Sequence, residues 1–247
     1  MINGFIDIHC HILPGLDDGS LTLNETEEML SIAREDGISG IVATPHSMNG
    51  VYNNIRKTIH EAIAELKIRS DDCQVYIGAE VRIGRDLLTR IIEGELPLIN
   101  DKRYLLLELP AYGIPPMEDL ENIIKNLSSY GITPIFPHPE RNIPLINDLS
   151  IMNRMIKCGA LFQVTAMSVT GQFGSAIREA AHTMIKYGYI HAVASDAHNG
   201  KNRPPVLSEA YKVVLNNFGE YEAKQLFMYN PFRIINGESI VVSQVCE

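Results

Sequence analysis

Cysteine and tryptophan are scarce in this sequence. The 247 residues contain no tryptophan and four cysteines, Cys10, Cys73, Cys158 and Cys246. The cysteines are widely separated and form no C-x-x-C pair, so neither a disulfide framework nor a structural zinc site is expected. We interpret them as small buried or incidental thiols.

Long apolar runs and excess positive charge are also missing. No apolar stretch approaches the ~18 residues that a membrane-spanning helix requires, and the N-terminus lacks the basic region of a signal peptide. The formal net charge is −9, from 21 Lys and Arg against 30 Asp and Glu. No general electrostatic attraction between this acidic chain and phosphate backbones or anionic lipids is therefore expected. We predict a cytoplasmic protein with no membrane span and no nucleic-acid partner.

Signatures of several enzyme classes are absent as well. Thiol phosphatases carry an arginine six positions after the nucleophilic cysteine, but after the first three cysteines those positions hold Leu16, Ala79 and Val164. The chain also lacks a G-x-S-x-G elbow, a G-x-x-x-x-G-K-[ST] phosphate loop and a G-x-G-x-x-G fingerprint. Thiol- or serine-based hydrolysis and nucleotide binding have no local support.

Short apolar runs rich in β-forming residues recur at nearly even intervals. The spacing is roughly the ~30 residues of a βα unit, which indicates parallel strands. The predicted strands cover residues 4–9, 39–44, 74–80, 103–109, 132–138, 160–165 and 190–196.

The segments between these strands have the apolar periodicity of helices. In residues 24–37, Asn24 followed by Glu27 predicts a capping box, and Gly37 predicts the end of the helix. Apolar residues at helical spacing, such as Ile59 and Ile63, predict faces that pack on the core. No linker interrupts the pattern, so we predict one α/β domain covering residues 1–247.

Metal-capable side chains lie at or just after the carboxyl ends of six predicted strands. In a parallel barrel these ends meet at one rim, where barrel enzymes build their active sites. Residues two apart on a strand face the same side, so both members of an H-x-H or D-x-H pair are able to ligate together. The residues are His9, His11, His46, Glu80, Glu108, His138, Asp196 and His198.

Two aspartates in the loop after the first strand extend this set. Asp17 and Asp18 precede a glycine, which is typical of a turn, and one of them is also a candidate ligand. Five imidazoles with four carboxylates suit Mn²⁺, Fe or Zn²⁺ better than Ca²⁺ or Mg²⁺. Nine ligands exceed the needs of one ion, so two or three ions are expected. His60, His182 and His191 fall elsewhere in the pattern and are not candidates.

Two arginines near the predicted rim indicate the substrate chemistry. Arg141 and Arg203 carry planar guanidinium groups that match phosphate oxygens. Clustered metals beside arginines favour phosphate ester hydrolysis, in which a metal-bound hydroxide attacks phosphorus and other ions stabilise the developing charge. No protein nucleophile is then required.

The motifs DIHCHILPGLDDG, ATPH, GAE, LLLELP, FPHPER and VASDAHN occur in this order along the chain. Together they resemble the polymerase and histidinol phosphatase (PHP) superfamily, and more narrowly its bacterial tyrosine-protein phosphatases of the CpsB and YwqE type, which act in capsular and exopolysaccharide synthesis. The resemblance implies a distorted seven-stranded β/α barrel, similar to a TIM barrel, with a trinuclear and usually manganese-dependent site.

Site residues carry over from the resemblance motif by motif. The implied metal ligands are His9, His11, Asp18, His46, Glu80, Glu108, His138, Asp196 and His198, and the implied phosphate-binding residues are Arg141 and Arg203. Spacing alone leaves Asp17 open as the alternative to Asp18. The implied substrate is phosphotyrosine in the tyrosine-rich tail of a bacterial tyrosine kinase. Tyrosine leaves as a phenolate of pKa ~10, so a general acid matters less, and none is assigned.

Three competing interpretations remain at this point. A related phosphatase would hydrolyse a small monoester such as histidinol phosphate. An amidohydrolase or metal-dependent deoxyribonuclease would share the H-x-H start, although amidohydrolases often need a lysine on the fourth strand, where this chain has Glu108. A metal-stabilised binding module would show a broken ligand set. Glu140 either orients a ligand or is a solvated loop carboxylate.

Overall fold

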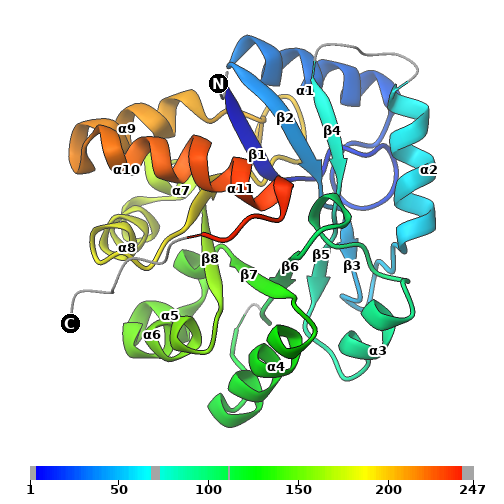
Figure 1. Cartoon of the computed structure of the whole chain (residues 1–247). Helices are drawn as coiled ribbons and strands as arrows, with labels where there is room; N and C mark the ends of the chain where they lie inside the picture. Colours follow the sequence, from blue (N-terminus) through cyan, green and yellow to red (C-terminus); the bar gives the residue numbers. More distant parts are fainter. Residues whose placement is uncertain (1–3, 68–72, 111, 241–247) are drawn as a thin grey trace.

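All seven predicted strands are present, and they form a parallel β/α barrel (Figure 1). The computed structural model describes residues 4–67, 73–110 and 112–240. The barrel strands are β1 (Phe5–Cys10), β2 (Ile38–Ala43) continued by β3 (His46–Ser47), β4 (Gln74–Ile77) continued by β5 (Glu80–Arg82), β6 (Tyr104–Glu108), β7 (Thr133–Pro137), β8 (Leu161–Thr165) and β9 (Ala192–Ala194).

Two interruptions distort the barrel. Hydrogen bonding divides the strands into one sheet ordered β1-β2-β4 and another ordered β3-β5-β6-β7-β8-β9. The second barrel strand breaks at Thr44 and Pro45, where proline lacks the N–H that a continuous ladder needs. The third breaks at Gly78, where a Cβ would lie 2.7 Å from Val42 Cγ1. Beyond both breaks β3 and β5 pair in parallel, with His46 opposite Glu80.

Backbone and carboxylate contacts close the barrel between β9 and β1. The amide of Asp196 donates to the His9 carbonyl at 2.8 Å, and the amide of His11 donates to the Ala197 carbonyl at 2.8 Å. The buried Asp7 carboxylate accepts hydrogen bonds from the Ser195 amide and hydroxyl. Burial raises the pKa of Asp7 to about 6 despite these hydrogen bonds. The contacts hold the ends of the two strands together.

Helices surround the strands (Figure 1). They are α1 (Leu23–Glu35), α2 (Arg56–Lys67), α3 (Leu87–Ile92), α4 (Met117–Ser129), α5 (Ile143–Asn147), α6 (Leu149–Lys157), α7 (Ala166–Thr170), α8 (Ser175–Lys186), α9 (Ser208–Phe218), α10 (Glu220–Lys224) and α11 (Asn230–Asn236). Short 3₁₀ helices are η1 (Ile99–Asp101) and η2 (Pro139–Arg141), and η3 (Gln225–Tyr229) is a π-helix between α10 and α11. No helix of the described ranges is long and apolar enough to cross a bilayer.

The predicted cap of α1 is wrong by two residues. Thr22, not Asn24, is the N-cap, and its hydroxyl accepts from the Glu25 amide at 3.2 Å. The Glu25 carboxylate in turn accepts from the Leu21 amide at 2.9 Å. Threonine followed three residues later by glutamate has the spacing of a capping box, but this glutamate accepts from the residue before the cap instead of from the cap itself. The predicted stop is confirmed, because Gly37 follows the helix with φ +86°.

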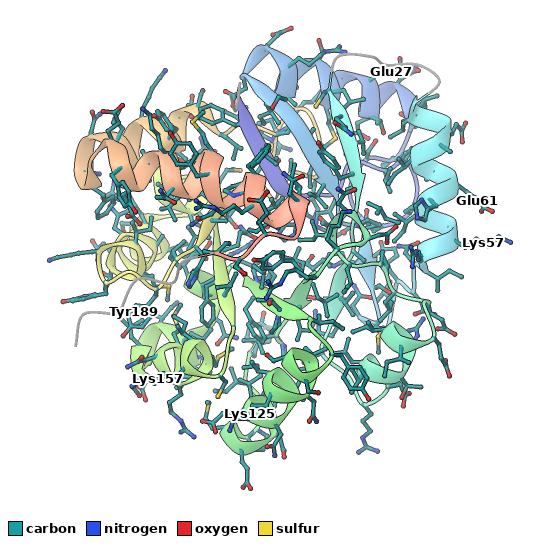
Figure 2. All side chains as sticks on the ribbon, viewed as in Figure 1. Glu27, Lys57, Glu61, Lys125, Lys157 and Tyr189 are labelled. Carbon is teal, nitrogen blue, oxygen red and sulfur yellow. The ribbon has the colours of Figure 1, made fainter. Side chains whose placement is uncertain are left out.

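Two apolar clusters stabilise the barrel. The larger lies between the strands and the outer helices and includes Ile59 and Ile63 of α2. On the opposite face of α2, Lys57 and Glu61 point to solvent (Figure 2). The smaller cluster fills the barrel and meets α11, and it contains Ile6, Ile8, Tyr104, Leu106, Ile135, Leu161, Ile234 and Ile235 among others. Apolar packing therefore closes the amino ends of the strands.

The cysteines match their predicted role within the described ranges. Cys10 and Cys73 are buried free thiols, and Cys158 is a partly buried free thiol. Burial raises the pKa of Cys10 well above its ordinary value, which keeps the thiol protonated. Cys246 lies outside the described residues.

Candidate metal centre

The candidate ligands gather at the carboxyl ends of the strands, around a cavity of about 290 Å³. His9 and His11 form the buried floor, both 0% exposed. The cavity lining contains the rest of the predicted set together with both predicted arginines, namely Asp18, His46, Glu80, Glu108, His138, Asp196, His198, Arg141 and Arg203. The rim predicted from strand order is therefore present as one continuous site.

An irregularity in β1 directs both floor histidines into the site. The pairing register of β1 with β2 shifts between Asp7 and Cys10. Ile8 packs in the barrel interior, whereas Cys10 packs in the outer cluster. Regular alternation from Ile8 would turn His9 outward, but a bulge adds a residue and re-aims the side chains that follow. His9 and His11 therefore share a face, as predicted.

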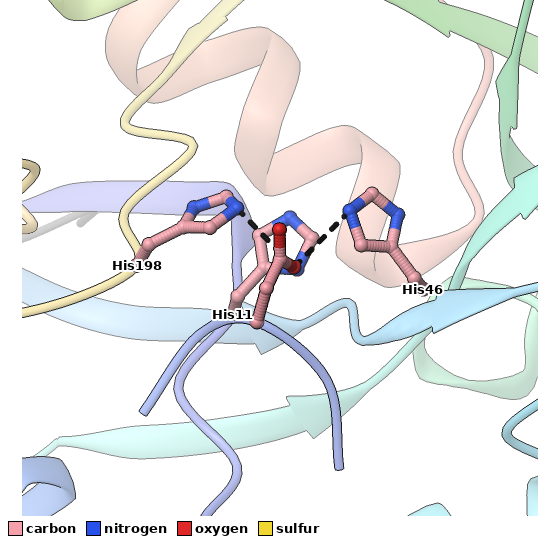
Figure 3. A group of neighbouring side chains, drawn as sticks. His11, His46 and His198 are labelled. Atoms are coloured by element: carbon pink, nitrogen blue, oxygen red, sulfur yellow. Dashed lines mark ion pairs between the residues drawn. The ribbon is translucent and has the colours of Figure 1, made fainter. Parts of the chain in front are cut away.

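Eight of the nine predicted ligands fall into three overlapping groups, each with donor atoms within 4.8 Å of one another. The groups are His9, His11 and Asp196; His11, Asp18, His46 and His198; and His46, Glu80 and Glu108. Figure 3 shows His11 between His198 and His46. His11 and His46 each belong to two groups, so the three groups form a chain of adjacent positions.

His138 is the ligand candidate outside these groups. Its Nε2 lies 2.8 Å from Glu80 Oε1, and its backbone adopts φ +43°. A left-handed backbone is uncommon for histidine and clusters at functional sites. Asp196 has the same feature, with φ +53°. His138 directly follows β7, and Asp196 lies just after β9. Both therefore adopt left-handed backbone conformations at the carboxyl-end rim.

The donor atoms fit divalent cations. The Nε2 atoms of His9 and His11 lie 3.1 Å apart, close enough to bind one ion together. Within the described structure, the buried His46 Nδ1 and Glu80 Oε2 make no hydrogen bond although they are 3.0 Å apart. Buried polar atoms without partners are costly, and a coordinated ion would satisfy both. Mixed imidazole and carboxylate donors suit Mn²⁺, Fe or Zn²⁺.

The electrostatics of the floor also favour positive charge. Burial alone lowers the pKa of His11, but the carboxylates of Asp17, Asp196 and Glu80 outweigh it and raise the pKa well above its ordinary value. Burial raises the pKa of Glu80, yet His9 and the surrounding imidazoles hold that pKa well below its usual range. The floor therefore stabilises a cation.

The two loop aspartates have different environments. Asp17 is buried, its Oδ2 lies 2.6 Å from His11 Nδ1, and it accepts from the His46 amide at 2.9 Å. Burial raises its pKa, but the contact with His11 outweighs this and lowers the pKa to about 2. Asp18 is 54% exposed and its Oδ1 lies 3.4 Å from His46 Nε2. Asp17 orients the ring of the candidate ligand His11, and Asp18 faces the imidazole of His46.

Two residues that the motifs did not reveal hold candidate ligands in place. Gln163 of β8 is fully buried, and its Oε1 lies 2.9 Å from His9 Nδ1, where it fixes the ring with Nε2 toward the site. Arg82 donates to both oxygens of Glu108, at 2.8 and 3.1 Å. Two features of the sequence could have identified these supporting residues. One is a glutamine within a buried strand, and the other is an arginine two residues after Glu80.

Both predicted arginines converge on one carboxylate oxygen. Arg141 and Arg203 donate to Oδ2 of Asp196, the latter at 2.7 Å, while Oδ1 faces the floor histidines at 3.4 and 3.5 Å. Burial raises the pKa of Asp196, but the nearby imidazoles and guanidinium groups hold it well below its usual value. Asp196 therefore joins the ligand floor to the arginines.

Glu140 is not a solvated loop carboxylate. It is fully buried, and its Oε1 accepts from the Thr165 amide at 3.0 Å and the Ser168 hydroxyl at 2.6 Å. The Thr165 hydroxyl in turn accepts from Arg141 at 2.9 Å. Glu140 therefore fixes the strand end that orients Arg141, rather than orienting a metal ligand directly.

The three excluded histidines lie away from the site. His60 on α2 is exposed and lies 3.3 Å from Asp101, and His182 on α8 contacts the Val169 carbonyl. His191 is buried at the start of β9, where its Nδ1 accepts from the Phe162 amide at 3.1 Å. Burial lowers the pKa of His191 to about 4, so this imidazole is neutral.

Comparison with known proteins places the chain in a family. Residues 5–236 match the family model described as "Capsular polysaccharide synthesis, CpsB/CapC". The chain belongs to the CpsB/CapC family. Tyrosine-protein phosphatase YwqE of Bacillus subtilis (strain 168) is 36% identical over 218 residues, covering 87% of this chain and 85% of YwqE.

A second relative and a solved structure support this assignment. Tyrosine-protein phosphatase CpsB of Streptococcus pneumoniae is 31% identical over 248 residues, covering 95% of this chain and 100% of CpsB. A crystal structure from work on YwqE and CpsB, described as unique metal-dependent tyrosine phosphatases, has a TM-score of 0.92 and 33% identity. It covers 97% of this chain and 98% of the solved chain. The distorted PHP-type barrel is thereby confirmed.

Proposed function

We propose that this CpsB/CapC family member is a metal-dependent protein-tyrosine phosphatase. Its substrate would be phosphotyrosine on a bacterial tyrosine kinase that regulates capsular or exopolysaccharide synthesis. The observation that carries the proposal is a cavity where three overlapping groups of imidazole and carboxylate donors lie beside two arginines. Relatives named tyrosine-protein phosphatases, at 31 and 36% identity over most of the chain, support it.

The proposed ligand set is the one that the motifs predicted, with Asp18 in preference to Asp17. It comprises His9, His11, Asp18, His46, Glu80, Glu108, His138, Asp196 and His198. We propose two or three ions, Mn²⁺ first and Fe or Zn²⁺ as alternatives. Bound divalent ions would supply an activated water and Lewis-acid stabilisation of charge on the phosphoryl group.

The protein's own residues prepare the site for a phosphoryl dianion. Arg141 and Arg203 present N–H groups beside Asp196, and the guanidinium fork matches phosphate oxygens bidentately. Burial lowers the pKa of Arg141, but Asp196 and Glu140 outweigh it and raise the pKa, so the guanidinium stays charged. His198, whose pKa burial and the charge of His11 lower to about 3, is a neutral imidazole able to ligate.

A small phosphate monoester such as histidinol phosphate is the second candidate substrate. The same metals and arginines would bind its phosphoryl group, so the site geometry alone is compatible with both. The family membership favours the tyrosine phosphatase. An amidohydrolase is disfavoured because Glu108 stands on the fourth barrel strand. A binding module is disfavoured because eight of the nine predicted ligands lie in the three donor groups.

The test compares turnover of a phosphotyrosyl peptide with that of histidinol phosphate, both with Mn²⁺. We expect faster hydrolysis of the peptide and loss of activity after chelation, restored by Mn²⁺. Arg103→Gln, which removes an arginine at the amino end of the barrel, is a matched control for Arg141→Gln, since only the latter should lower activity. Faster turnover of histidinol phosphate would overturn the substrate assignment.

The remaining proposals concern the chain as a whole. We propose one catalytic domain over residues 1–247, supported by the seven barrel strands, and action in the cytoplasm, where a kinase tail would be reached. The partner would be that phosphotyrosine-containing tail. The net charge of −9 argues against nucleic acid.

A further inference from the structure

The loop between β3 and α2 folds back on the strand that carries His46. Within this loop, residues 48–55, Asn49 Oδ1 accepts from two amides further along the loop at 3.0 and 2.7 Å, which makes a turn. The Ser47 hydroxyl donates to the Asn54 carbonyl at 2.7 Å. The end of the loop therefore lies beside β3, and Asn54 is held next to the backbone of a candidate ligand.

The side-chain amide of Asn54 joins two segments that are far apart in the sequence. Its Nδ2 donates to the Leu16 carbonyl at 2.8 Å and to the His46 carbonyl at 2.9 Å. An amide nitrogen carries two hydrogens, so these two hydrogen bonds use its full donor capacity. Leu16 directly precedes Asp17 and Asp18. These two hydrogen bonds, the Asn54 link, therefore connect the loop after β1 to β3.

Asp17 makes a second contact between the same two segments. The His46 amide donates to Asp17 Oδ2 at 2.9 Å. Both backbone polar groups of His46 are thus tied to the loop after β1, the amide directly and the carbonyl through Asn54. The Asp18 side chain is 54% exposed. Packing therefore does not hold this carboxylate, and its position depends on the backbone of its loop.

The three donor groups differ in how they depend on the Asn54 link. One group takes a ligand from each linked segment, and its members are His11, Asp18, His46 and His198. A second takes no ligand from residues 16–18 or from β3, and its members are His9, His11 and Asp196. The third shares only His46 with the linked segments. Loss of the link should therefore weaken the first metal position and spare the second.

We propose that Asn54 is a positioning residue for the metal position formed by His11, Asp18, His46 and His198. Asn54 belongs to none of the donor groups and does not line the described cavity. Its amide acts through the backbone, because it fixes the spacing between the Asp18 loop and His46. The proposal rests on the proposed metal-dependent function and deepens it, since it names a residue that controls one ion position selectively.

Mn²⁺ binding to the metal-stripped, full-length protein tests the proposal. Competition with a chelator measures the affinity of each successive ion for the wild-type protein and for Asn54→Ala, which removes both donors. We expect one ion to bind roughly 10- to 100-fold more weakly in the variant, because Asp18 and His46 are no longer held at one spacing. The ion at the position that takes no ligand from either linked segment should keep its wild-type affinity.

Two further variants separate the hydrogen bonds from other effects of the substitution. Asn54→Leu keeps the size of the side chain but has no donor, so it should behave as Asn54→Ala does. Asn53→Ala is the matched control in the same loop. The Asn53 Oδ1 accepts from Arg90 Nη1 at 2.8 Å, so this side chain contacts α3 instead of the linked segments. Asn53→Ala should leave the affinity of every ion unchanged.

Phosphotyrosyl-peptide turnover gives a second measurement. In Asn54→Ala, the Mn²⁺ concentration for half-maximal turnover should rise by the same factor by which the affinity of the weakened ion falls. Turnover and KM at saturating Mn²⁺ should return to the wild-type values, because every proposed ligand and both arginines are still present. The variant would thus affect the loading of one ion without affecting the chemical step.

The outcomes separate this proposal from the proposed function. Unchanged Mn²⁺ affinities in both Asn54 variants, or the same loss in Asn53→Ala, would overturn the positioning role. Equal weakening of every ion would also overturn it, because it would show general damage to the site. If the wild-type protein binds Mn²⁺ but hydrolyses no phosphotyrosyl peptide, the phosphatase is overturned, and the affinities still decide the role of Asn54. Wild-type protein that binds no Mn²⁺ would overturn both.

Discussion

The two ends of the barrel use the same strands for opposite purposes. At the amino ends, Ile6, Tyr104 and Leu161 pack against Ile234 and Ile235 of α11 as an apolar cluster. At the carboxyl ends, buried imidazoles and carboxylates face one another, and His46 Nδ1 and Glu80 Oε2 lack hydrogen bonds in the described structure. The apolar packing at the amino ends stabilises the fold. The carboxyl ends bury polar groups, which costs stability but places the candidate ligands together. Substitutions at the two ends should therefore separate activity from stability.

The largest effect is expected at the floor of the site. His11→Ala removes a donor shared by two of the three groups. Metal ions contribute several kcal/mol to phosphoryl transfer, so activity should fall by roughly a thousandfold or more. The free energy of unfolding without metal should not fall by a comparable amount. Peptide turnover and urea unfolding measure the two, and unchanged turnover would contradict the ligand role.

The opposite separation is expected at α11. Ile234 is 0% exposed, so Ile234→Ala should lower the free energy of unfolding by about 3 kcal/mol through the cavity it leaves. Turnover measured well below the melting temperature should stay within about twofold. Ile92→Ala on α3, where the side chain is 56% exposed, is the control and should change stability by less than about 0.5 kcal/mol. A large loss of turnover in Ile234→Ala would break the comparison.

His191, at the start of β9, should make the free energy of unfolding depend on pH. Its pKa is about 4 when folded and ~6.5 when unfolded, so the unfolded chain binds the extra proton between these values. The stability from the neutral imidazole is complete above pH ~6.5 and is lost as the pH falls toward 4, by up to about 3 kcal/mol.

His191→Asn removes this titration while keeping an acceptor for the Phe162 amide. Urea unfolding of both proteins between pH 4 and 7 measures the difference. The free energy of unfolding should decrease less steeply with falling pH in the variant. Parallel curves for the two proteins would show that His191 contributes no pH dependence.

The smallest effect is expected for a residue that orients a ligand without binding metal. Asp17→Asn weakens the contact with His11 Nδ1 but leaves every proposed ligand in place. Such changes typically reduce metal affinity by 10- to 100-fold. Competition with a chelator measures the affinity, and the number of bound ions should not change. Asp119→Asn, on the exposed face of α4, should have no effect. Loss of a whole ion in Asp17→Asn would instead favour Asp17 as a ligand.

The sequence predicts most of the fold and the membership of the site, because both depend on simple periodicities. Strands about 30 residues apart indicate βα units with parallel pairing, and parallel pairing brings the carboxyl ends of the strands together. The irregularities were not predictable in this way. The register shift in β1 and the break at Gly78 depend on which strands become neighbours. Gln163 and Arg82 act through contacts between strands, which no local motif records.

The same distinction applies to the loop aspartates and to the start of α1. Asp17 and Asp18 are equivalent in spacing, and only the fold places Asp17 against His11 and Asp18 toward His46 and His198. Thr22 and Asn24 are both favourable N-cap residues. Which of them caps α1 depends on the residue at which the loop after β1 ends and the helix begins. The local sequence identifies which residues could be the ligand or the N-cap. Tertiary contacts determine which of these residues takes the role.

Titration of metal-stripped protein with Mn²⁺, following bound ions and phosphotyrosyl-peptide turnover in the same samples, tests the central claim most directly. The three donor groups predict that turnover is absent without metal and appears only once at least two ions are bound per chain. Full turnover in the stripped protein, or saturation with fewer than two ions bound, would contradict the proposed metal centre.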